Sequence, residues 1–390
     1  MLSGVNVALG VTGSIAAVKV VELAHELRRR GANVRAVMSN SAQGIINPWA
    51  VEFATDNHVV TEITGKVEHV ELCGRDEWAD VFLIAPATAN TVGKIAGAVD
   101  DTPVTTCATT ALGADVPVVI APAMHEPMYD HPGVLDAIER VESWGVDFVE
   151  PRIEEGKAKI ATEDMIALDV ARATGDQPLA GKGIVVTSGA TSEPIDPVRV
   201  LTSRASGKTG RAVARACYVA GANVALVHDA PDVPYATGVR VETAEEMTDA
   251  VNDLVTAFPA DALISVAAIS DYTTDTADQK IRSGQDLSLD LQPTRKLIDT
   301  VRESHPDIPI VGFKAETSGD DTAMVAAARE TLVRAECSFV VANDASVMGE
   351  DETRTLFVRD NSVRKYSGSK KELGTRVAKE VAEELSAARR

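Results

Sequence analysis

Residues 4–38 read GVNVALGVTGSIAAVKVVELAHELRRRGANVRAVM, and this stretch decides the fold. It begins with a short apolar run at 5–10 and ends with another at 34–38. Between them, residues 15–30 carry apolar side chains at helical spacing, and Gly31 stands where such a helix would end. Strand, helix and strand in this order predict a βαβ unit of a mainly parallel sheet.

The same design returns in the second half of the chain. Residues 184–188 form an apolar run, a helical pattern covers 207–220, and residues 224–227 are apolar again. The tetrapeptide GANV occurs in both units, at 31–34 and 221–224. Two such units so far apart predict two α/β domains, each a mainly parallel, Rossmann-like three-layer sandwich.

The polar residues 174–182, which include Gly and Pro, mark the boundary between the two units. We therefore expect a first domain over 1–175, a linker over 176–182 and a second domain over 183–390. Further apolar runs predict strands at 81–85, 116–121, 262–267, 287–291, 310–313 and 339–341.

The composition excludes several classes of protein. Apolar residues make up 45% and charged residues 25% of the 390 residues, which is the usual globular mixture. The formal net charge of −20 repels phosphate backbones and anionic lipid, so we expect no nucleic-acid or membrane partner. No stretch approaches the roughly 18 apolar residues that a membrane span needs. The cysteines form no CxxC pair, which favours a reducing, cytoplasmic compartment; they are Cys73, Cys107, Cys217 and Cys337.

Residues 10–16, GVTGSIA, join the first strand to its helix. Small residues there leave the backbone N–H groups of the helix start open to a phosphate or a similar anion. The motif is not GxGxxG, because Thr12 occupies the place of the second glycine. The next strand ends in Ser39 and Asn40 instead of the acidic residue that would hold a ribose, which disfavours NAD. A tight turn without a ligand is the alternative.

Two further loops follow strands, APATAN at 85–90 and APAMHEPMYDH at 121–131. In the first, Thr88 can cap the next helix or hydrogen-bond a ligand. The second holds two Met, a Tyr and two His, which a simple spacer would not need. It is not the metalloprotease motif HExxH, because Tyr129 stands in place of the second His.

Taken in order, GSIAA, EHVEL, WADVFLIAPATAN and PAMHEPMY resemble the flavin-dependent decarboxylases that act on 4′-phosphopantothenoylcysteine. The resemblance covers about residues 4–170 and implies a flavodoxin-like flavoprotein domain. In that family FMN binds between the subunits of a trimer. The positions that would line its site are Gly13, Ser14, Ser39, Ala87 and Thr88.

The resemblance also implies the chemistry of this domain. FMN oxidises the cysteine thiol of the substrate to a thioaldehyde, the neighbouring carboxylate leaves as CO₂, and the reduced flavin returns the electrons. His69 of EHVEL, which alone would more often be a structural histidine, would transfer the proton. Met124 and His125 would hold the departing carboxylate.

Two positions depart from the bacterial pattern of this family. His125 stands in place of Asn, and it can still donate a hydrogen bond to a carboxylate, more strongly when it is protonated. The bacterial flap carries a Cys that protonates the product, but residues 155–160, EGKAKI, contain none and have Lys159 at about that place. Lys159, Lys157 and His125 are the candidate proton donors.

In the second half, TSGATSEPIDPVR at 187–199 follows a strand, and its two prolines hold Asp196 and Arg199 in a fixed loop. SRASGKTG at 203–210 then enters a helix. Its GKT is not part of a Walker A motif, because Thr202 stands where the first glycine is needed. A phosphate at this helix start remains reasonable, held by Ser206, Gly207 and Lys208.

Four later segments combine carboxylate, lysine, aromatic and amide groups: AAISDY at 267–272, KIRS at 280–283, GFKAET at 312–317 and AND at 342–344. Because open α/β sheets bind ligands at the carboxyl ends of their strands, this set suits a nucleoside triphosphate with Mg²⁺.

These residues resemble the phosphopantothenate–cysteine ligase domain over about residues 182–390, and the whole chain resembles the bifunctional coenzyme A biosynthesis proteins, of archaeal type. The resemblance implies that CTP activates the carboxylate of 4′-phosphopantothenate as an acyl-cytidylate and that the amine of L-cysteine displaces CMP. Lys280 would stabilise charge on the α-phosphate. The other nucleotide contacts would be Ala267, Asp271, Lys296, Phe313 and Asn343, and the substrate contacts Ser203 and Arg204.

This half also departs from the bacterial pattern. Ser203 replaces an Asn, and Thr331 and Ala335 replace two lysines near the nucleotide phosphates, which leaves Arg334 and Lys314 as candidate substitutes. CTP is therefore favoured over ATP by the resemblance alone. The resemblance further implies a homo-oligomer of trimeric decarboxylase and dimeric ligase domains, which together allow a dodecamer.

A protein of another class is the alternative: a flavin-binding regulatory protein that keeps the fold without turnover. The missing flap Cys favours it, whereas His69, Lys280 and the ligase motifs favour the enzyme. Yellow colour on purification followed by an assay for CO₂ release separates the two.

Overall fold

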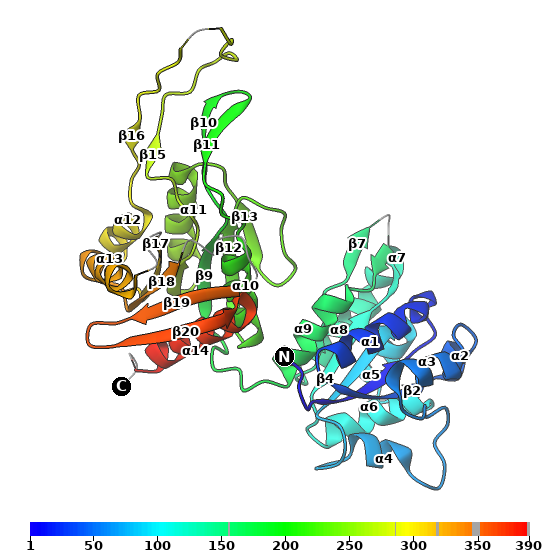
Figure 1. The fold of residues 1–390 in the computed structure, drawn as a ribbon. Coiled ribbons are helices and arrows are strands. Elements are labelled where there is room, and N and C mark those ends of the chain that lie inside the picture. Colours follow the sequence, from blue (N-terminus) through cyan, green and yellow to red (C-terminus); the bar gives the residue numbers. More distant parts are fainter. Residues whose placement is uncertain (155–156, 285, 317–319, 345–351, 388–390) are drawn as a thin grey trace. The chain divides into compact units, whose positions relative to one another are not determined.

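The computed structural model describes residues 1–154, 157–284, 286–316, 320–344 and 352–387. The chain divides into two compact units, Met1–Gly175 and Asp176–Arg390, each with its own sheet (Figure 1). Each unit has helices on both faces of a largely parallel sheet, so the predicted α/β three-layer class is confirmed.

The sheet of unit 1 is parallel and has the order β2-β1-β3-β4-β6. Its strands are β1 (Asn6–Val11), β2 (Asn33–Met38), β3 (Val81–Ala87), β4 (Val118–Pro122) and β6 (Asp147–Phe148). One face packs against α1 (Val20–Arg29), α3 (Pro48–Thr55) and α9 (Glu163–Ala173). The other face lies under α4 (Glu68–Cys73), α5 (Ala89–Ala96), α6 (Pro103–Gly113) and α8 (Pro132–Glu142).

The expected βαβ opening is present, with one local difference. The helix predicted from residue 15 begins as a 3₁₀ segment, η1 (Ile15–Lys19), and becomes α1 only at Val20. The helix ends where predicted, because Gly31 has a φ of +97°. A Cβ at Gly31 would also lie 2.9 Å from the Cα of Ser3, so this turn requires glycine.

The sheet of unit 2 has eight strands in the order β13-β12-β9-β14-β17-β18-β19-β20. Six are parallel: β9 (Gly183–Ser188), β12 (Asn223–His228), β13 (Thr237–Arg240), β14 (Ala260–Ser265), β17 (Ile310–Glu316) and β18 (Phe339–Asp344). The last two, β19 (Glu352–Val358) and β20 (Val363–Ser369), pair antiparallel. On one face lie α10 (Lys208–Val219) and α14 (Lys370–Ala387), and on the other α11 (Ala244–Ala257), α12 (Leu297–Ser304) and α13 (Asp321–Arg334).

Two projections extend from the body of unit 2 (Figure 1). One is the hairpin of β10 (Ser192–Asp196) and β11 (Arg199–Thr202), and the other is an arm that begins and ends at the short pair β15 (Tyr272–Thr273) and β16 (Gln292–Pro293). The strand predicted at 287–291 was wrong, because these residues lie in the arm without strand pairing. Their alternating leucines resemble a half-buried strand, but Leu287, Leu289 and Leu291 are exposed.

Candidate functional site

The residues predicted to bind flavin lie together at the carboxyl edge of the unit 1 sheet. Gly13 and Ser14 follow β1, Ser39 follows β2, and Ala87 ends β3 with Thr88 after it. Strands β2, β1 and β3 are neighbours, and the chain runs outward in opposite directions from the β1/β3 pair. Such a reversal of strand order is where open α/β sheets bind ligands.

The hydroxyl groups at this edge cap helices. The side chain of Ser14 accepts from Ala16 N at 3.3 Å, that of Ser39 from Ala42 N at 3.3 Å and that of Thr88 from Thr91 N at 3.2 Å. Helix capping, the alternative to ligand binding at Thr88, is therefore present, and these hydroxyls keep lone pairs or protons for a ligand.

Gly13 lets the turn pack closely against Ser41. A Cβ at this position would lie 2.4 Å from Ser41 Oγ, so the turn as it stands requires glycine. Gly13 and Ser14 are half-buried, and the side chain of Ser39 is buried. The open backbone and the ring of hydroxyls fit the phosphate end of FMN.

A hydrogen bond joins the glycine turn to the PAMHEP loop. Ser14 Oγ donates to the carbonyl of Ala123 at 3.1 Å. A second hydrogen bond crosses this edge: buried Thr12 donates to the carbonyl of Pro86 at 2.7 Å. The sequence did not predict it. Both bonds depend on strand order, which local sequence patterns do not reveal.

Met124 and His125 form a strand, β5, that pairs with the flap. The flap strands are β7 (Arg152–Glu154) and β8 (Lys157–Lys159), and His125 lies opposite Lys157. His125 is exposed and Met124 half-buried. Lys159 forms an ion pair with Glu154, with Nζ 3.1 Å from Oε2. Of the predicted flap stretch, residues 155–156 lie outside the described residues.

His69 lies elsewhere in unit 1. It is half-buried in α4, which packs against α6, and Figure 1 shows α4 and α7 (Glu126–Tyr129) at opposite ends of the unit. Its Nδ1 is buried and has no hydrogen-bond partner among the residues described. One chain alone does not bring His69 to Met124 and His125.

The cysteines offer no substitute proton donor near the flap. Cys73, Cys107, Cys217 and Cys337 are all buried and free. A hydrogen bond from the Cys107 thiol to Cys73 and burial both raise the pKa of Cys107, and burial raises the pKa of Cys217 to about 12. The thiols of Cys107 and Cys217 therefore stay protonated and unreactive.

In unit 2, three predicted nucleotide contacts meet at the carboxyl edge of the sheet. Ala267 follows β14, and Phe313 and Asn343 lie in the neighbouring strands β17 and β18. Thr187, which the sequence analysis passed over, holds Ala267: its buried Oγ1 accepts from the N–H groups of Val266 and Ala267 at 3.0 Å each. Asn343 Oδ1 is buried and has no hydrogen-bond partner within the described chain, so it is available to a ligand.

The other predicted polar residues of unit 2 do not form one cluster with these three. Asp271 and Lys296 form an exposed ion pair, and Ser203 and Arg204 are exposed between β11 and α10. Of the candidate phosphate ligands, Arg334 pairs with Asp299, whereas Lys314 is exposed on β17 next to Phe313. Lys280 is exposed on the arm between β15 and β16.

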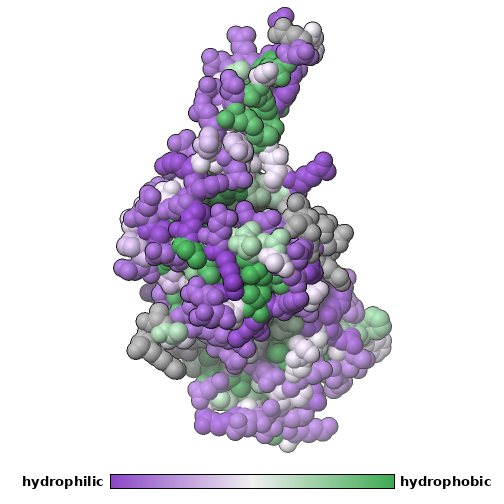
Figure 2. Space-filling model, turned by 60° about the vertical axis from the view of Figure 1, so that its left-hand side comes forward, coloured by the Kyte–Doolittle hydropathy of each residue, from purple (hydrophilic) through white to green (hydrophobic). Residues whose placement is uncertain are grey.

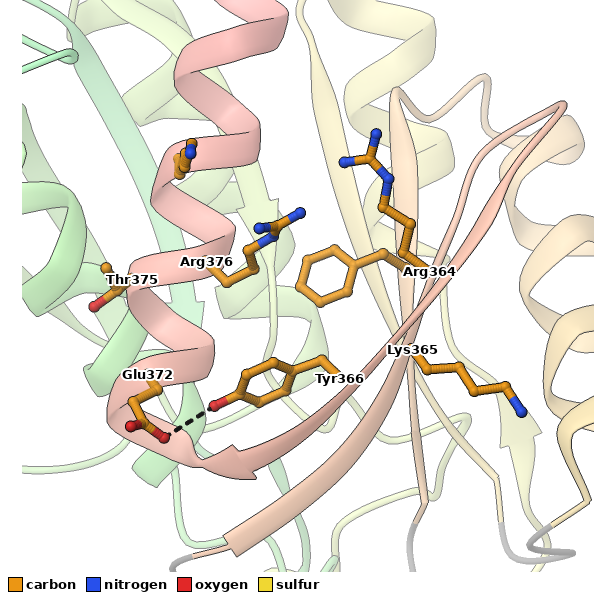
Figure 3. Close-up of a pocket in the computed structure, with 8 residues that line it drawn as sticks. Arg364, Lys365, Tyr366, Glu372, Thr375 and Arg376 are labelled. Carbon is orange, nitrogen blue, oxygen red and sulfur yellow. Dashed lines mark hydrogen bonds between the residues drawn. The ribbon is translucent and has the colours of Figure 1, made fainter.

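A cavity of about 530 Å³ lies between β20 and α14, away from all predicted site residues. Figure 3 shows Arg364 and Arg376 facing each other across it, with Lys365 pointing away. Both arginines bind the buried carboxylate of Glu380, at 3.2 and 2.7 Å, and Arg359 binds it at 2.8 Å. The ion pairs with Glu380 connect β20 to α14. Because the carboxylate already neutralises these guanidinium groups, we assign the cavity no ligand.

Two kinds of feature are absent from the described residues. They contain no group of three or more His, Cys, Asp or Glu placed to hold a metal ion. No helix among them is both long and apolar enough to span a bilayer.

Each of the two units matches a known protein family. Residues 1–174 match the Flavoprotein family, and residues 179–385 match the family of the DNA/pantothenate metabolism flavoprotein C-terminal domain. The coenzyme A biosynthesis bifunctional protein CoaBC of Thermococcus kodakarensis is 47% identical over 385 residues, which cover 97% of this chain and 95% of that protein. Its namesake in Methanocaldococcus jannaschii is 34% identical over 387 residues, 98% of this chain and 94% of that protein. The solved structure of an FMN-dependent cysteine decarboxylase, SpaF, is 31% identical and covers 45% of this chain and 100% of its own, with a TM-score of 0.40.

Proposed function

The chain belongs to the family of bifunctional coenzyme A biosynthesis proteins, and from that premise we propose how its residues carry two reactions. It is a phosphopantothenate–cysteine ligase and a phosphopantothenoylcysteine decarboxylase, and its flavoprotein domain uses FMN. The presence of both domain families favours this enzyme over a regulatory flavoprotein.

The decarboxylase site lies at the carboxyl edge of unit 1. The turn at Gly13 and Ser14, with Ser39, Ala87 and Thr88, holds FMN, which supplies the two-electron acceptor for the cysteine thiol. Met124 and His125 orient the carboxylate that leaves as CO₂. The observation that carries this assignment is the hydrogen bond from Ser14 to Ala123, because it joins the cofactor turn to the residue before Met124.

His69 and His125 divide the proton transfers. His69 accepts the proton lost during thiol oxidation, and its buried Nδ1, which has no partner among the described residues, suits a group whose partner is a ligand or a second chain. Exposed His125 is the donor that we favour for the proton returned to the product over Lys159, which pairs with Glu154, and Lys157 is the remaining candidate. Because His69 and His125 lie apart in one chain, the complete site forms between two copies in a trimer.

The ligase site lies at the carboxyl edge of unit 2. Ala267, Phe313 and Asn343 bind CTP, with the ion pair of Asp271 and Lys296 at its border. The carboxylate of 4′-phosphopantothenate, held by Ser203 and Arg204, attacks the α-phosphorus and pyrophosphate leaves. The amine of L-cysteine then attacks the acyl carbon, and CMP leaves. Mg²⁺ would enter with the nucleotide and would supply positive charge that offsets the charge of the phosphates.

Lys280 stabilises the charge on the attacked phosphate, and the arm that carries it also supports a dimer. The arm and the neighbouring hairpin expose apolar side chains, which Figure 2 shows as a green band on the projection. These are Tyr272, Leu287, Leu289, Leu291, Val198 and Val200. A second copy that covers this surface would explain why these side chains are exposed in one chain, and the protein would then be a homo-oligomer. We place the protein in the reducing cytoplasm.

One experiment tests the assignment of the two sites. We expect His69→Asn to abolish CO₂ release from 4′-phosphopantothenoylcysteine and to leave ligation intact, and Lys280→Gln to do the reverse. The assay supplies phosphopantothenate, cysteine, Mg²⁺ and either CTP or ATP, and follows pyrophosphate and CO₂. Equal damage to both activities in a folded protein would refute the assignment.

A mixing experiment tests the shared decarboxylase site. Chains carrying His69→Asn and chains carrying His125→Ala are refolded together in equal amounts. Each site draws one residue from each of two neighbours, so about a quarter of the wild-type CO₂ release should return. Absence of any recovery in refolded trimers would place both histidines in one chain.

A further inference from the structure

The turn of the β10–β11 hairpin is built around Asp196. Its side chain is fully buried, and Oδ1 accepts from Val198 N at 2.8 Å and Arg199 N at 2.9 Å. Oδ2 binds the guanidinium of Arg199 at 2.7 Å. Burial favours the neutral acid, but the backbone donors and the Arg199 charge together lower the pKa of Asp196, so it stays ionised.

The same ion pair grips the arm at Ile281. Asp196 Oδ2 accepts from Ile281 N at 3.0 Å, and Arg199 donates to the carbonyl of Ile281 at 3.0 Å. Both backbone polar groups of this residue are thus held by a pair more than 80 residues away in sequence. Ile281 directly follows Lys280.

Two further bonds hold the preceding arm residues to the hairpin. Ala277 N donates to the carbonyl of Ile195 at 3.0 Å, and Thr276 Oγ1 donates to the carbonyl of Pro194 at 2.9 Å. The described residues from 274 to 284 form no helix or strand. Their position therefore depends on these bonds to the hairpin, because no sheet ladder fixes them.

We propose that Asp196 and Arg199 are positioning residues for ligation, which act by holding the backbone at Ile281 so that Lys280 is presented at a fixed place. The inference rests on the proposed role of Lys280. A lysine has a long, flexible side chain, and fixing its backbone lowers the entropic cost of bringing the ammonium to the phosphate in the transition state. The charged pair suits this task because its bonds to the Ile281 backbone do not depend on a strand register.

Asp196→Asn removes the negative charge that holds Arg199. It also replaces one of the two carboxylate oxygens that accept hydrogen bonds in this clamp, the name we use for Asp196 and Arg199 together with their bonds to Ile281. We expect kcat for ligation to fall on the order of 10- to 100-fold, while KM for CTP and phosphopantothenate stays within about threefold. CO₂ release from supplied 4′-phosphopantothenoylcysteine should not change. Arg199→Lys, which keeps the charge but not the two-pronged geometry, should produce the same pattern and serves if Asp196→Asn does not fold.

The matched control is Asp261→Asn. Asp261 also pairs with a lysine, Lys182, and accepts from a backbone N–H, that of Gly183 at 2.9 Å, and it makes no hydrogen bond or ion pair to the described residues of the arm. It should lower the stability of unit 2 with little effect on kcat for ligation. An equal fall in kcat for Asp261→Asn and Asp196→Asn would mean that Asp196 affects ligation only by stabilising unit 2, and it would overturn the proposal.

A double-mutant cycle separates positioning from an independent role. If Asp196 acts through Lys280, adding Asp196→Asn should not slow any further the trace ligation that Lys280→Gln retains, measured with the enzyme in excess over its substrates. Additive losses would overturn the proposal. If Lys280→Gln ligates at the wild-type rate, the proposed role of Lys280 has failed; if it is inactive while Asp196→Asn is fully active, only the positioning role has failed.

Discussion

Gly13 occupies a position that leaves no room for a side chain. We expect Gly13→Ala to weaken FMN binding by about tenfold or more, because the new Cβ would collide with Ser41 at the cofactor turn. Flavin absorbance per chain after dialysis measures this. Gly65→Ala is the control, since a Cβ at Gly65 meets nothing within 4 Å. Equal flavin content in both variants would contradict the assignment of this turn.

Glu380 is a buried carboxylate surrounded by guanidinium groups. We expect Glu380→Gln to lower the free energy of unfolding of unit 2 by about 3 kcal/mol, because Arg359, Arg364 and Arg376 lose their common partner. Urea unfolding followed by circular dichroism measures the difference.

The effect of Glu380 also depends on pH. Burial raises its pKa, but hydrogen bonding to Arg359 and the charges of Arg376, Arg359 and Arg364 outweigh burial, so its pKa is lowered on folding. A lowered pKa stabilises the folded state above the unfolded pKa, and this contribution is lost as the pH falls through the folded value. The difference between wild type and Glu380→Gln should therefore shrink in acid, and a difference that grew in acid would contradict this role.

The sequence predicted site residues unevenly at this scale. Gly13, Ser14 and Thr88 could be predicted as site residues, because small residues in a short turn between an apolar strand and a helix are typical of an anion-binding site. Thr12, Thr187 and Ile281 could not, since each acts through a bond to a residue more than 70 positions away. Such partners follow from strand order and from the contact between hairpin and arm, which local patterns do not contain.

At the scale of elements, α10 and α14 pack closely through Gly374. A Cβ at this position would lie 2.4 Å from the carbonyl oxygen of Ala212, which is backbone and cannot rotate away. We expect Gly374→Ala to lower the free energy of unfolding of unit 2 by about 1–3 kcal/mol, as overpacking does. Thermal unfolding measures it against Gly93→Ala in α5, where a Cβ meets nothing within 4 Å. A stabilised Gly374→Ala would show that the two helices can move apart freely.

Strands were predictable where they are buried on both faces. Residues 5–10 and 310–313 are apolar runs and form β1 and β17 with small shifts of their ends. The leucines of 287–291 have the same apolar pattern but form no strand and are exposed. The pattern shows that side chains are apolar, and it does not show whether another part of the protein covers them. The pairing of β5 with β8 was likewise hidden, since two strands of two and three residues carry no periodicity.

For the whole molecule, the net charge of −20 sets the response to salt. Repulsion between carboxylates opposes compaction, and the screening length shortens from about 10 Å at 0.1 M salt to about 3 Å at 1 M. We therefore expect Tm to rise by several degrees between 0.1 and 1 M KCl, as measured by scanning calorimetry. Sucrose, which does not screen charge, is the control. A Tm that is unchanged or lower at 1 M KCl would contradict a charge-limited fold.

The division into two α/β units was predictable because the βαβ pattern occurs twice and a polar stretch separates the copies. The projecting arm of unit 2 was not, because it contains no regular repeat and its role depends on what lies beside it.

That arm has a consequence for how the protein can be inactivated. Lys280 and Arg282 are exposed, and the backbone between them is held by the bonds of Asp196 and Arg199 to Ile281, so trypsin can cut there once those bonds open. A single nick there leaves both cores intact and severs the arm beside Lys280. The nicked enzyme would release CO₂ from a supplied thiol substrate but no longer produce that substrate, so one peptide bond separates the two halves of its work.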